Sequence, residues 1–378
     1  MVALFQESSL SQDSVPQESV PQAGVTRPRL RTKVLSVEDI RQIVVHVGLD
    51  VLMDEMIARL TEAFAQFDPS ETVVPVRTGF SYEQPQVGLV EWMPLFQKYQ
   101  QIVVKAVGYH PHNPDVHHLP TVLSTLSAYD PSSGHLSAVM DGTFLTALRT
   151  GAASAIASQH LALPHSKTLG LIGAGAQAVT QLHALSRCFE LERVLIFDSD
   201  SKVSGSFSER IAGLGLETLV FQQATVSEIV AAADIVCTAT SVEVGAGPVF
   251  DDHSLQPWLH VNAVGADFPG KFELPLSLLQ RGFVCPDFRA QAILEGECQQ
   301  LTERGEIGPE LSAVVKRPEQ YQEKQQQLTV FDSTGFALED QVAMNMMLDY
   351  AKALDVGSWM SLESAAADVK NPYSFLSL

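Results

Sequence analysis

The sequence has few cysteines and few basic residues for its length. Four cysteines are scattered through 378 residues, and none forms a Cys-x-x-Cys pair. Scattered thiols are typical of core residues in a reducing compartment, so we expect no zinc site. The 24 basic residues stand against 44 acidic ones, which gives a formal charge of −20. Such a surface repels nucleic acid and anionic membranes, and neither is an expected partner.

The chain also lacks an apolar run of membrane-spanning length and a basic stretch ahead of an apolar segment at its N-terminus. These absences favour a cytoplasmic protein. No internal repeat is visible. The hydrophobic share of 46% is ordinary for a globular protein, and the length suggests two domains.

One stretch, residues 167–200, has the order of elements that a dinucleotide-binding unit requires. An apolar run at 168–172 predicts a buried strand, and a helical pattern follows the segment GAGAQA at 173–178. A second apolar run at 194–197 leads directly to Asp198. Glycine-rich turns also occur as plain connectors, but the flanking strands and the acid together predict a Rossmann unit.

The residues of this unit have distinct expected tasks. Gly173 permits a tight turn, Gly175 lets the backbone approach a pyrophosphate, and Ala178 allows close helix–strand packing. The helix start offers free N–H groups and a positive dipole end to the phosphates. Asp198 can accept hydrogen bonds from ribose hydroxyls and would repel a 2′-phosphate, which favours NAD(H) over NADP(H).

The alternation of strands and helices continues after this unit and predicts a doubly wound parallel sheet. Ligands of such sheets bind at the carboxyl ends of the strands. Thr240 and the segment 262–267 follow two predicted strands, so Asp267 is expected to point towards the cofactor crevice. A loop aspartate is usually only solvated, but this position makes Asp267 a catalytic candidate. The further predicted strands are 218–221, 234–239, 260–264 and 282–285.

The regions on either side of the Rossmann unit have mixed patterns. Residues 36–39 resemble a helix capping box, and a second amphipathic helix is expected at 51–67. A final strand at 328–331 and a helix at 337–354 most simply return to complete the first domain. The strands expected before the Rossmann unit are 73–76, 88–91, 102–107, 122–129 and 136–140.

Two features each admit two interpretations. Arg149 lies in a small-residue helix, 144–161, and needs an anion: either a carboxylate of the protein or a phosphate or carboxylate of a ligand. The loop at 109–118 contains four histidines, which are potential metal ligands. No carboxylate or cysteine pairs with them at a recurrent metal spacing, so a polar loop beside the substrate is preferred and no metal is predicted.

Several motifs resemble the ornithine cyclodeaminase/mu-crystallin family from about residue 35 to residue 355. The resemblance implies a homodimer with an amino-acid substrate and NAD as cofactor. It also implies a Rossmann domain at 149–327, inserted in an α+β substrate-binding and dimerisation domain at 33–148 plus 328–357. Tails would occupy 1–32 and 358–378. The motifs are VEWMP (90–94), LPTV (119–122), ALRTGAAS (147–154), GAGAQA (173–178), HVNAVGADFPGKFEL (260–274), LEGECQQ (294–300) and FDSTGFALED (331–340).

The resemblance also implies roles for individual residues. Arg77 and Lys105 would bind the substrate carboxylate, with Glu91 nearby, and Asp267 would be the general acid/base beside the amine. The other residues placed at the substrate are Arg149 and Thr334. The residues expected to contact NAD, from the glycine turn, the strand ends or the resemblance, are Thr121, Arg149, Gly173, Gly175, Ala176, Gln177, Asp198, Thr240, Ala263, Val264, Gly265, Lys271 and Ser333.

The activity that this resemblance favours is the conversion of L-ornithine to L-proline and ammonia, with NAD regenerated in each turnover. Two alternatives stay open: a dehydrogenase or ketimine reductase similar to alanine dehydrogenase, and a non-catalytic binding protein of the mu-crystallin kind. That last branch lacks an aspartate matching Asp267. Tyr109, Ala266 and Phe268 depart from the cyclodeaminase pattern, and an aspartate like Asp267 also occurs in the dehydrogenase branch, so the substrate stays open.

Overall fold

The structure is a computed structural model that describes residues 30–301 and 307–377. Residues Arg31–Glu363 form one compact unit, which contains both sheets of the protein. Most of the N-terminal tail expected at 1–32 lies outside the described residues, although Thr32 already opens a strand. Beyond Glu363, the described residues include a 3-10 helix, η5 (Pro372–Ser377).

The first sheet has eight strands in the order β15-β1-β7-β6-β5-β4-β2, with β3 also paired to β4. Strands β4 to β7 form an antiparallel meander. The strand expected at 73–76 is shorter, since Pro75 cannot donate to a ladder. The bounds are β1 Thr32–Leu35, β2 Thr72–Val73, β3 Thr78–Tyr82, β4 Gly88–Gln97, β5 Gln101–Tyr109, β6 Val122–Tyr129, β7 Leu136–Asp141 and β15 Ser358–Met360.

The second sheet has seven strands, all parallel, in the order β10-β9-β8-β11-β12-β14-β13. The predicted doubly wound sheet is therefore confirmed. Its central strands are buried throughout, as a sheet covered on both faces requires. The bounds are β8 Thr168–Ile172, β9 Arg193–Phe197, β10 Val220–Gln223, β11 Ile235–Thr238, β12 His260–Ala263, β13 Phe283–Pro286 and β14 Thr329–Asp332.

Two expectations about the end of the chain are wrong. Strand β14 does not return to the first sheet but pairs in parallel with β12 and β13 in the second. A short buried strand carries no signal for its partner, because any parallel neighbour satisfies it equally. The chain then crosses over, since the following helix α12 packs on β4 and β5. The loose tail expected from 358 begins instead with β15, which pairs with β1.

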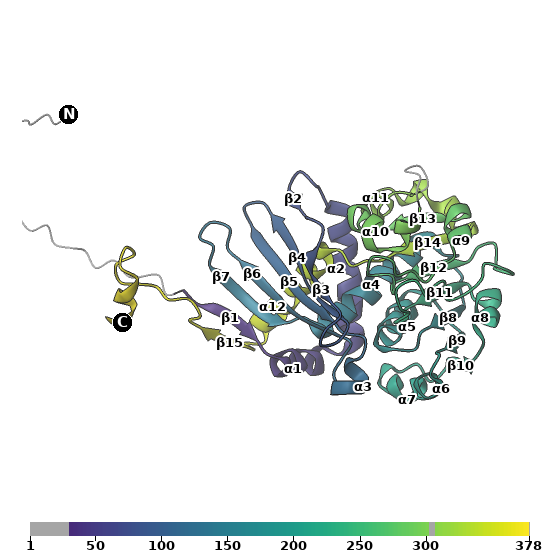
Figure 1. Ribbon diagram of the computed structural model, residues 1–378, viewed down its shortest axis with the longest axis horizontal. Helices are drawn as coiled ribbons and strands as arrows, with labels where there is room; N and C mark the ends of the chain where they lie inside the picture. Colours follow the sequence, from purple (N-terminus) through teal and green to yellow (C-terminus); the bar gives the residue numbers. More distant parts are fainter. Residues whose placement is uncertain (1–29, 302–306, 378) are drawn as a thin grey trace, which may run out of the picture. The chain divides into compact units, whose positions relative to one another are not determined.

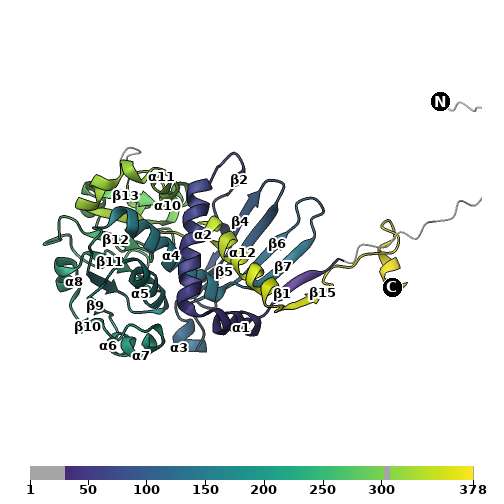
Figure 2. The same ribbon diagram turned by 180° about the vertical axis from the view of Figure 1, so that it is seen from behind.

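Long helices cover one face of the first sheet and join it to the second. Figures 1 and 2, seen from opposite sides, show α2 and α12 together on that face. The capping box predicted at 36–39 is present, with Ser36 and Asp39 bonded reciprocally at the start of α1. Leu52, Met56 and Leu60 recur along α2 at helical spacing and are buried. The bounds are α1 Val37–Val47, α2 Leu49–Gln66, α3 Asn113–His117, α4 Thr143–Leu161 and α12 Ala337–Ala353.

Helix α4 connects the two halves, and its small residues allow close packing on both sides. It contacts α2 and α12 on one side and α5, β12 and β14 on the other. A Cβ added at Gly151 would lie 2.4 Å from the Thr180 carbonyl oxygen, so only glycine allows this approach of α4 to α5. The remaining helices are α5 Ala176–Cys188, α6 Ser201–Gly205, α7 Phe207–Arg210, η1 Ala212–Leu214, α8 Val226–Ala232, α9 Leu276–Arg281, α10 Arg289–Glu295, η2 Glu297–Gln300, α11 Leu311–Lys316, η3 Pro318–Gln320 and η4 Gln322–Gln326.

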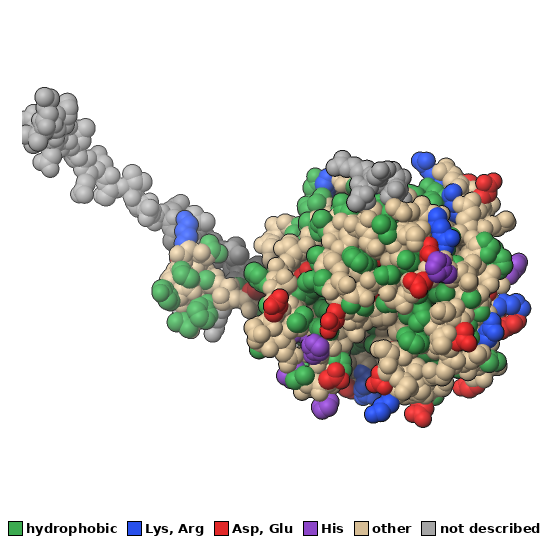
Figure 3. All heavy atoms as spheres, turned by 45° about the vertical axis from the view of Figure 1, so that its right-hand side comes forward, with side chains coloured by type: hydrophobic (Ala, Val, Ile, Leu, Met, Phe, Trp, Pro, Cys, Tyr) green, Lys and Arg blue, Asp and Glu red, His purple; other side chains and the backbone are tan. Residues whose placement is uncertain are grey.

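Figure 3 shows one face of the surface, on which acidic and basic side chains are interspersed. Among the helices that the structure describes, none has the length and apolarity needed to cross a bilayer.

Candidate active site

A cavity between the two sheets brings the predicted substrate residues together. It contains all six residues expected at the substrate or in catalysis, of which Arg149 was also expected at NAD, and three further residues expected at NAD: Gln177, Val264 and Ser333. A larger cavity near the end of α2 contains none of them. The lining residues are Arg77, Leu89, Glu91, Met93, Lys105, Val107, Tyr109, Val122, Thr146, Arg149, Thr150, Gln177, Val264, Asp267, Ser333, Thr334 and Gly335.

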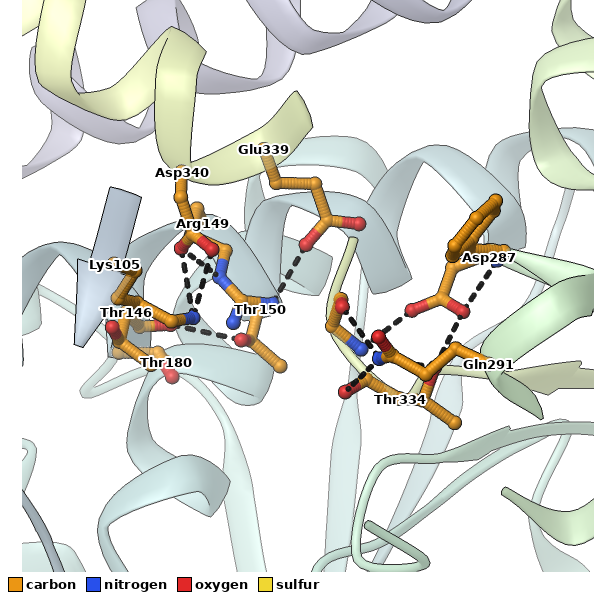
Figure 4. A network of polar contacts seen from close by, with 12 residues as sticks. Lys105, Thr146, Arg149, Thr150, Thr180, Asp287, Gln291, Thr334, Glu339 and Asp340 are labelled. Carbon is orange, nitrogen blue, oxygen red and sulfur yellow. Dashed lines mark hydrogen bonds and ion pairs between the residues drawn. The ribbon is translucent and has the colours of Figure 1, made fainter. Parts of the chain in front are cut away.

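Lys105 and Arg149 share one carboxylate at this cavity. Lys105 is on β5 and only 1% exposed, and its Nζ lies 2.8 Å and 3.0 Å from the two carboxylate oxygens of Asp340. Arg149 Nε donates to Asp340 Oδ1 at 3.1 Å, and its Nη1 donates to Glu339 Oε2 at 2.7 Å. Figure 4 shows both acids descending from the start of α12. The internal ion pair considered for Arg149 is therefore present, and Arg149 also lines the cavity.

Burial shifts the titration of this group. Burial, followed by the charge of Arg149, lowers the pKa of Lys105 to about 8, although Asp340 opposes the shift. Burial also raises the pKa of Glu339 to about 8, against the opposing charge of Arg149. Lys105 and Arg149 therefore share the Asp340 carboxylate, and the raised pKa of Glu339 weakens the second counter-charge of Arg149.

Arg77 contacts the backbone of Asp267 and two acidic side chains. Its Nε lies 2.5 Å from Glu295 Oε1 and 3.2 Å from Glu91 Oε2. Its Nη2 donates to the backbone oxygen of Asp267 at 2.6 Å, and its Nη1 donates to the backbone oxygen of Thr334 at 3.2 Å. Burial raises the pKa of Glu295 to about 7, although Arg77 opposes this. Glu295 lies inside the motif LEGECQQ, but no pattern in the sequence assigned it a role.

Asp267 lies at the cavity with a side chain that is 30% exposed. Its Oδ1 is 3.1 Å from Nζ of the buried Lys271, which also lies 3.4 Å from the Tyr109 hydroxyl and 5.1 Å from the centre of its ring. Burial opposes the charge of Lys271, but Asp267 raises its pKa above the usual range. Asp267 thus has a fixed cation on one side and the cavity on the other.

The loop that follows β14 is held by residues that the sequence did not single out. Asp287 accepts hydrogen bonds from Thr334 Oγ1 at 3.0 Å and from the backbone N–H of Gly335 at 2.6 Å. Gln291 Nε2 donates to Thr334 Oγ1 at 3.1 Å and to the Gly335 carbonyl at 2.9 Å. Gly335 has φ +92°, a conformation that favours glycine. Figure 4 shows the side chains of Asp287 and Gln291 both reaching towards this loop.

The glycine turn fits a dinucleotide. Gly173 has φ +89°, and a Cβ there would lie 2.6 Å from the Ala239 carbonyl oxygen. Gly175 precedes α5, no side chain caps this helix, and a Cβ at Gly175 would meet nothing within 4 Å. The helix start is therefore open to an anion. Asp198, just past β9, accepts a hydrogen bond from the backbone N–H of Ala174 at 2.8 Å and so lies against the turn.

The other expected cofactor residues, apart from Thr121, lie at the same edge of the second sheet. Ala176 and Gln177 form the first turn of α5, and Thr240 comes shortly after β11. Ala263 ends β12, Val264 and Gly265 follow it, and Ser333 follows β14. The Ser333 hydroxyl is buried with no hydrogen-bond partner among the described residues, which leaves it for a ligand. Thr121 lies just before β6, and its carbonyl accepts a hydrogen bond from the His110 N–H at 2.8 Å.

The histidine loop is joined to strand β3 by a hydrogen bond. The Tyr82 hydroxyl lies 2.8 Å from His110 Nε2, which ties the loop to β3. Within the described ranges, no three His, Cys, Asp or Glu side chains gather as metal ligands.

Comparisons with known proteins agree with this geometry. The model of the ornithine cyclodeaminase/mu-crystallin family matches residues 37–355. An L-lysine cyclodeaminase of Streptomyces rapamycinicus is 45% identical over 91% of this chain and 100% of its own. An ornithine cyclodeaminase of Agrobacterium tumefaciens is 32% identical over 88% of this chain and 90% of its own.

Two solved structures are similar over most of the chain. One describes recognition of L-lysine, L-ornithine and L-2,4-diaminobutyric acid by lysine cyclodeaminase, with 47% identity, a TM-score of 0.88, and coverage of 91% of this chain and 99% of that one. The other is an archaeal alanine dehydrogenase dimer with bound NAD, with 29% identity, a TM-score of 0.77, and coverage of 88% and 100%.

Proposed function

Because the chain belongs to the ornithine cyclodeaminase/mu-crystallin family, we propose that it is an NAD-dependent cyclodeaminase of L-α,ω-diamino acids. Its main substrate would be L-lysine, which gives the six-membered cyclic amino acid and ammonia, and L-ornithine would be a second substrate. The observation that carries the proposal is one cavity holding Arg77, Lys105 and Asp267 in a chain 45% identical to an L-lysine cyclodeaminase. Ornithine, which the motifs favoured, comes second because the identity to the ornithine enzyme is 32%.

The cavity suits a diamino acid in charge and in shape. The cations Lys105 and Arg149 would bind the substrate carboxylate, with Arg77 close by. Leu89 and Met93 give the same cavity an apolar wall, which suits the methylene chain between the two amines.

The residues of the glycine turn would hold NAD, and Asp198 would contact its ribose. Bound NAD would supply reversible hydride transfer, which oxidises the substrate at Cα and later reduces the cyclic imine. Asp267 would take a proton from the α-ammonium group, because the nitrogen lone pair must be free before that carbon can lose a hydride. Lys271 would orient the Asp267 carboxylate. Holding both amines of one substrate in the cavity favours ring closure through high effective molarity.

A single assay tests the proposal. The purified protein is incubated with L-lysine or L-ornithine and a catalytic amount of NAD+, and the cyclic amino acid, ammonia and NADH are measured. We expect cyclic product and ammonia in equal amounts without accumulation of NADH, and faster turnover of lysine. Faster turnover of ornithine would reverse the order of the substrates.

A second candidate is an amino-acid dehydrogenase or imine reductase. It is favoured by the similarity to the NAD-bound alanine dehydrogenase. Stoichiometric NADH from L-alanine, with no cyclic product from diamino acids, would replace the first proposal by this one. Binding of NAD without turnover of any amino acid or cyclic imine would point to the non-catalytic alternative.

The partner that fits the first sheet is a second copy of this chain. Residues of β4 alternate between the buried cavity side, with Met93 3% exposed, and an outer side, with Trp92 39% exposed. Phe80 on β3 packs edge-on against Trp92, with ring centroids 5.6 Å apart, and is 69% exposed. An apolar outer face of this kind suits a symmetric dimer. The first sheet with α12 would then be the dimerisation and substrate part, and the second sheet the NAD-binding part.

A further inference from the structure

Glu273 is a buried carboxylate at the carboxyl edge of the parallel sheet, and the proposed chemistry does not use it. Its side chain is 0% exposed. Its Oε1 accepts a hydrogen bond from the backbone N–H of Thr240 at 2.6 Å, and its Oε2 accepts one from the backbone N–H of Gly265 at 3.0 Å. One carboxylate therefore joins the loop after β11 to the loop after β12.

These two loops are neighbours at the edge where the cofactor is expected. Strands β11 and β12 pair in register up to Thr238 and Ala263, and the Val264 N–H then donates to the Thr238 carbonyl at 3.0 Å. Glu273 supplies the acceptors just beyond this bond, at Thr240 and Gly265. The carboxylate thus continues the connection between the strands after the ladder itself has ended.

Gly265 is matched to this contact. A Cβ added at Gly265 would lie 2.3 Å from Glu273 Oε1 and 2.5 Å from Oε2. Real Cβ atoms do not approach oxygen so closely, so any other residue would displace the carboxylate. The glycine and the glutamate therefore depend on each other. Gly265 was expected to contact the cofactor, whereas Glu273 was expected to have no role.

Two further buried carboxylates hold Glu273 in turn. Glu297 Oε1 accepts a hydrogen bond from the backbone N–H of Glu273 at 2.7 Å. The backbone N–H groups of Glu297 and Cys298 donate to Asp332 at 2.9 Å and 2.8 Å. Asp332 ends β14, the strand beside β12. The series Asp332, Glu297 and Glu273 therefore runs from the sheet through η2 to the two loops.

We propose that Glu273 is a positioning residue for the dinucleotide, and that Glu297 and Asp332 fix its place. This inference rests on the NAD cofactor of the proposed function. In this class of sheet a dinucleotide lies across the carboxyl ends of the strands. Asp198 on the β9 side holds the adenosine ribose, so the β11 and β12 loops, on the other side of β8, hold the nicotinamide half. Glu273 therefore supports binding of that half.

The test is Glu273→Gln, with NAD+ and ADP titrated separately by calorimetry. The amide keeps one acceptor oxygen and turns an N–H donor towards a backbone N–H, so one loop is released. We expect NAD+ to bind about tenfold more weakly, as for the loss of one charged hydrogen bond. ADP carries only the adenosine half, so its affinity should stay within about twofold.

A matched control lies at the opposite edge of the same sheet. Asp234 Oδ2 also accepts two backbone hydrogen bonds, from the N–H of Lys167 at 2.9 Å and from that of Thr168 at 3.0 Å. Asp234→Asn loses the same kind of contact far from the carboxyl ends. We expect a lower thermal midpoint with unchanged affinity for NAD+ and ADP.

Three outcomes would overturn the inference. The first is wild-type NAD+ affinity in the Gln variant, and the second is an equal loss of NAD+ and ADP affinity. The third outcome serves if the variant does not fold, because it is measured on the wild-type protein without cofactor. There the amides of Thr240 and Gly265 should exchange hydrogen slowly. Fast exchange would contradict the two hydrogen bonds to Glu273. If the wild-type protein itself does not bind NAD+, the proposed function fails as well, which distinguishes the two failures.

Discussion

Asp267 has two possible roles that its contacts make separable. Its carboxylate lies 3.1 Å from Lys271 and borders the cavity, so it is placed both to brace a turn and to exchange a proton with a substrate. An amide of the same shape separates the two roles, because it can still brace the turn but cannot accept a proton.

Asp267→Asn preserves the shape of the side chain but removes the proton acceptor. We expect turnover to fall by about 10² to 10⁴, the range typical of a lost acid/base. NAD affinity should remain near that of the wild type, because we propose that the glycine turn and Asp198 hold the cofactor. Turnover, NAD affinity and thermal midpoint are measured on one preparation. A variant that loses stability and affinity together, while its folded fraction keeps normal turnover, would show that Asp267 only braces the turn.

The turn between β8 and α5 offers a matched pair of variants at the scale of one element. A Cβ at Gly175 meets nothing within 4 Å, so Gly175→Ala should fold normally. The new methyl group occupies the space expected for the pyrophosphate, and NAD affinity should fall about tenfold or more. Calorimetry with NAD+ and thermal unfolding check both statements. Unchanged NAD affinity would contradict the placement of the pyrophosphate.

Gly173→Ala is the contrasting variant in the same turn. Its φ of +89° is strained for alanine, and its Cβ would lie 2.6 Å from the Ala239 carbonyl oxygen. We expect a loss of at least about 1 to 2 kcal/mol in the free energy of unfolding, together with lost NAD affinity. Denaturant unfolding measures the first quantity. Equal stability of the two alanine variants would show that the turn tolerates both.

At the scale of the whole molecule, the buried acids predict how stability depends on pH. Burial raises the pKa of Asp332 to about 7 and that of Glu339 to about 8, from usual values of 3.8 and 4.5. Below the usual values both the folded and the unfolded chain are protonated, and the stabilising contribution is complete. As pH rises towards 8, the unfolded chain releases these protons first, so the contribution is lost.

We therefore expect the thermal midpoint to decrease as the pH is raised from 5 to 8, to the extent that these acids determine it. Lys105 changes the stability in the opposite direction, but only at higher pH, since its pKa is lowered to about 8 from 10.5. Glu339→Gln removes one raised group and should flatten the pH dependence. Scans of wild type and variant at several pH values check this; parallel curves would show that Glu339 does not titrate in that window.

The outer face of the first sheet predicts the assembly state. Trp92→Arg places a charge on the apolar face opposite the cavity, and we expect light scattering to show half the wild-type mass. Val220→Arg is the control, since Val220 is exposed on the second sheet. A dimer that persists in the Trp92 variant, or a monomeric wild-type protein, would contradict the proposed interface.

The sequence by itself determined the local features. The capping box at Ser36, the glycine turn at Gly173 and the alternation of strands and helices are local features. Each depends on residues a few positions apart, so short-range stereochemistry is enough to predict it. The position of Asp267 after a strand likewise placed it at the cavity edge. Family motifs brought Arg77 and Lys105 into the same prediction.

Only the tertiary structure decided which distant groups pair. Lys105 and Asp340 are 235 residues apart, and Arg149 and Asp340 are 191 apart, so no local pattern relates them. The same holds for the placement of β14 beside β12, and for Glu273 between Thr240 and Gly265. A buried charge needs a partner, but the sequence does not say which one, because the partner is set by how complete sheets and helices pack. Motifs in the sequence named Arg77, Lys105 and Asp267, which line the cavity, whereas the contacts that hold them come only from the tertiary structure.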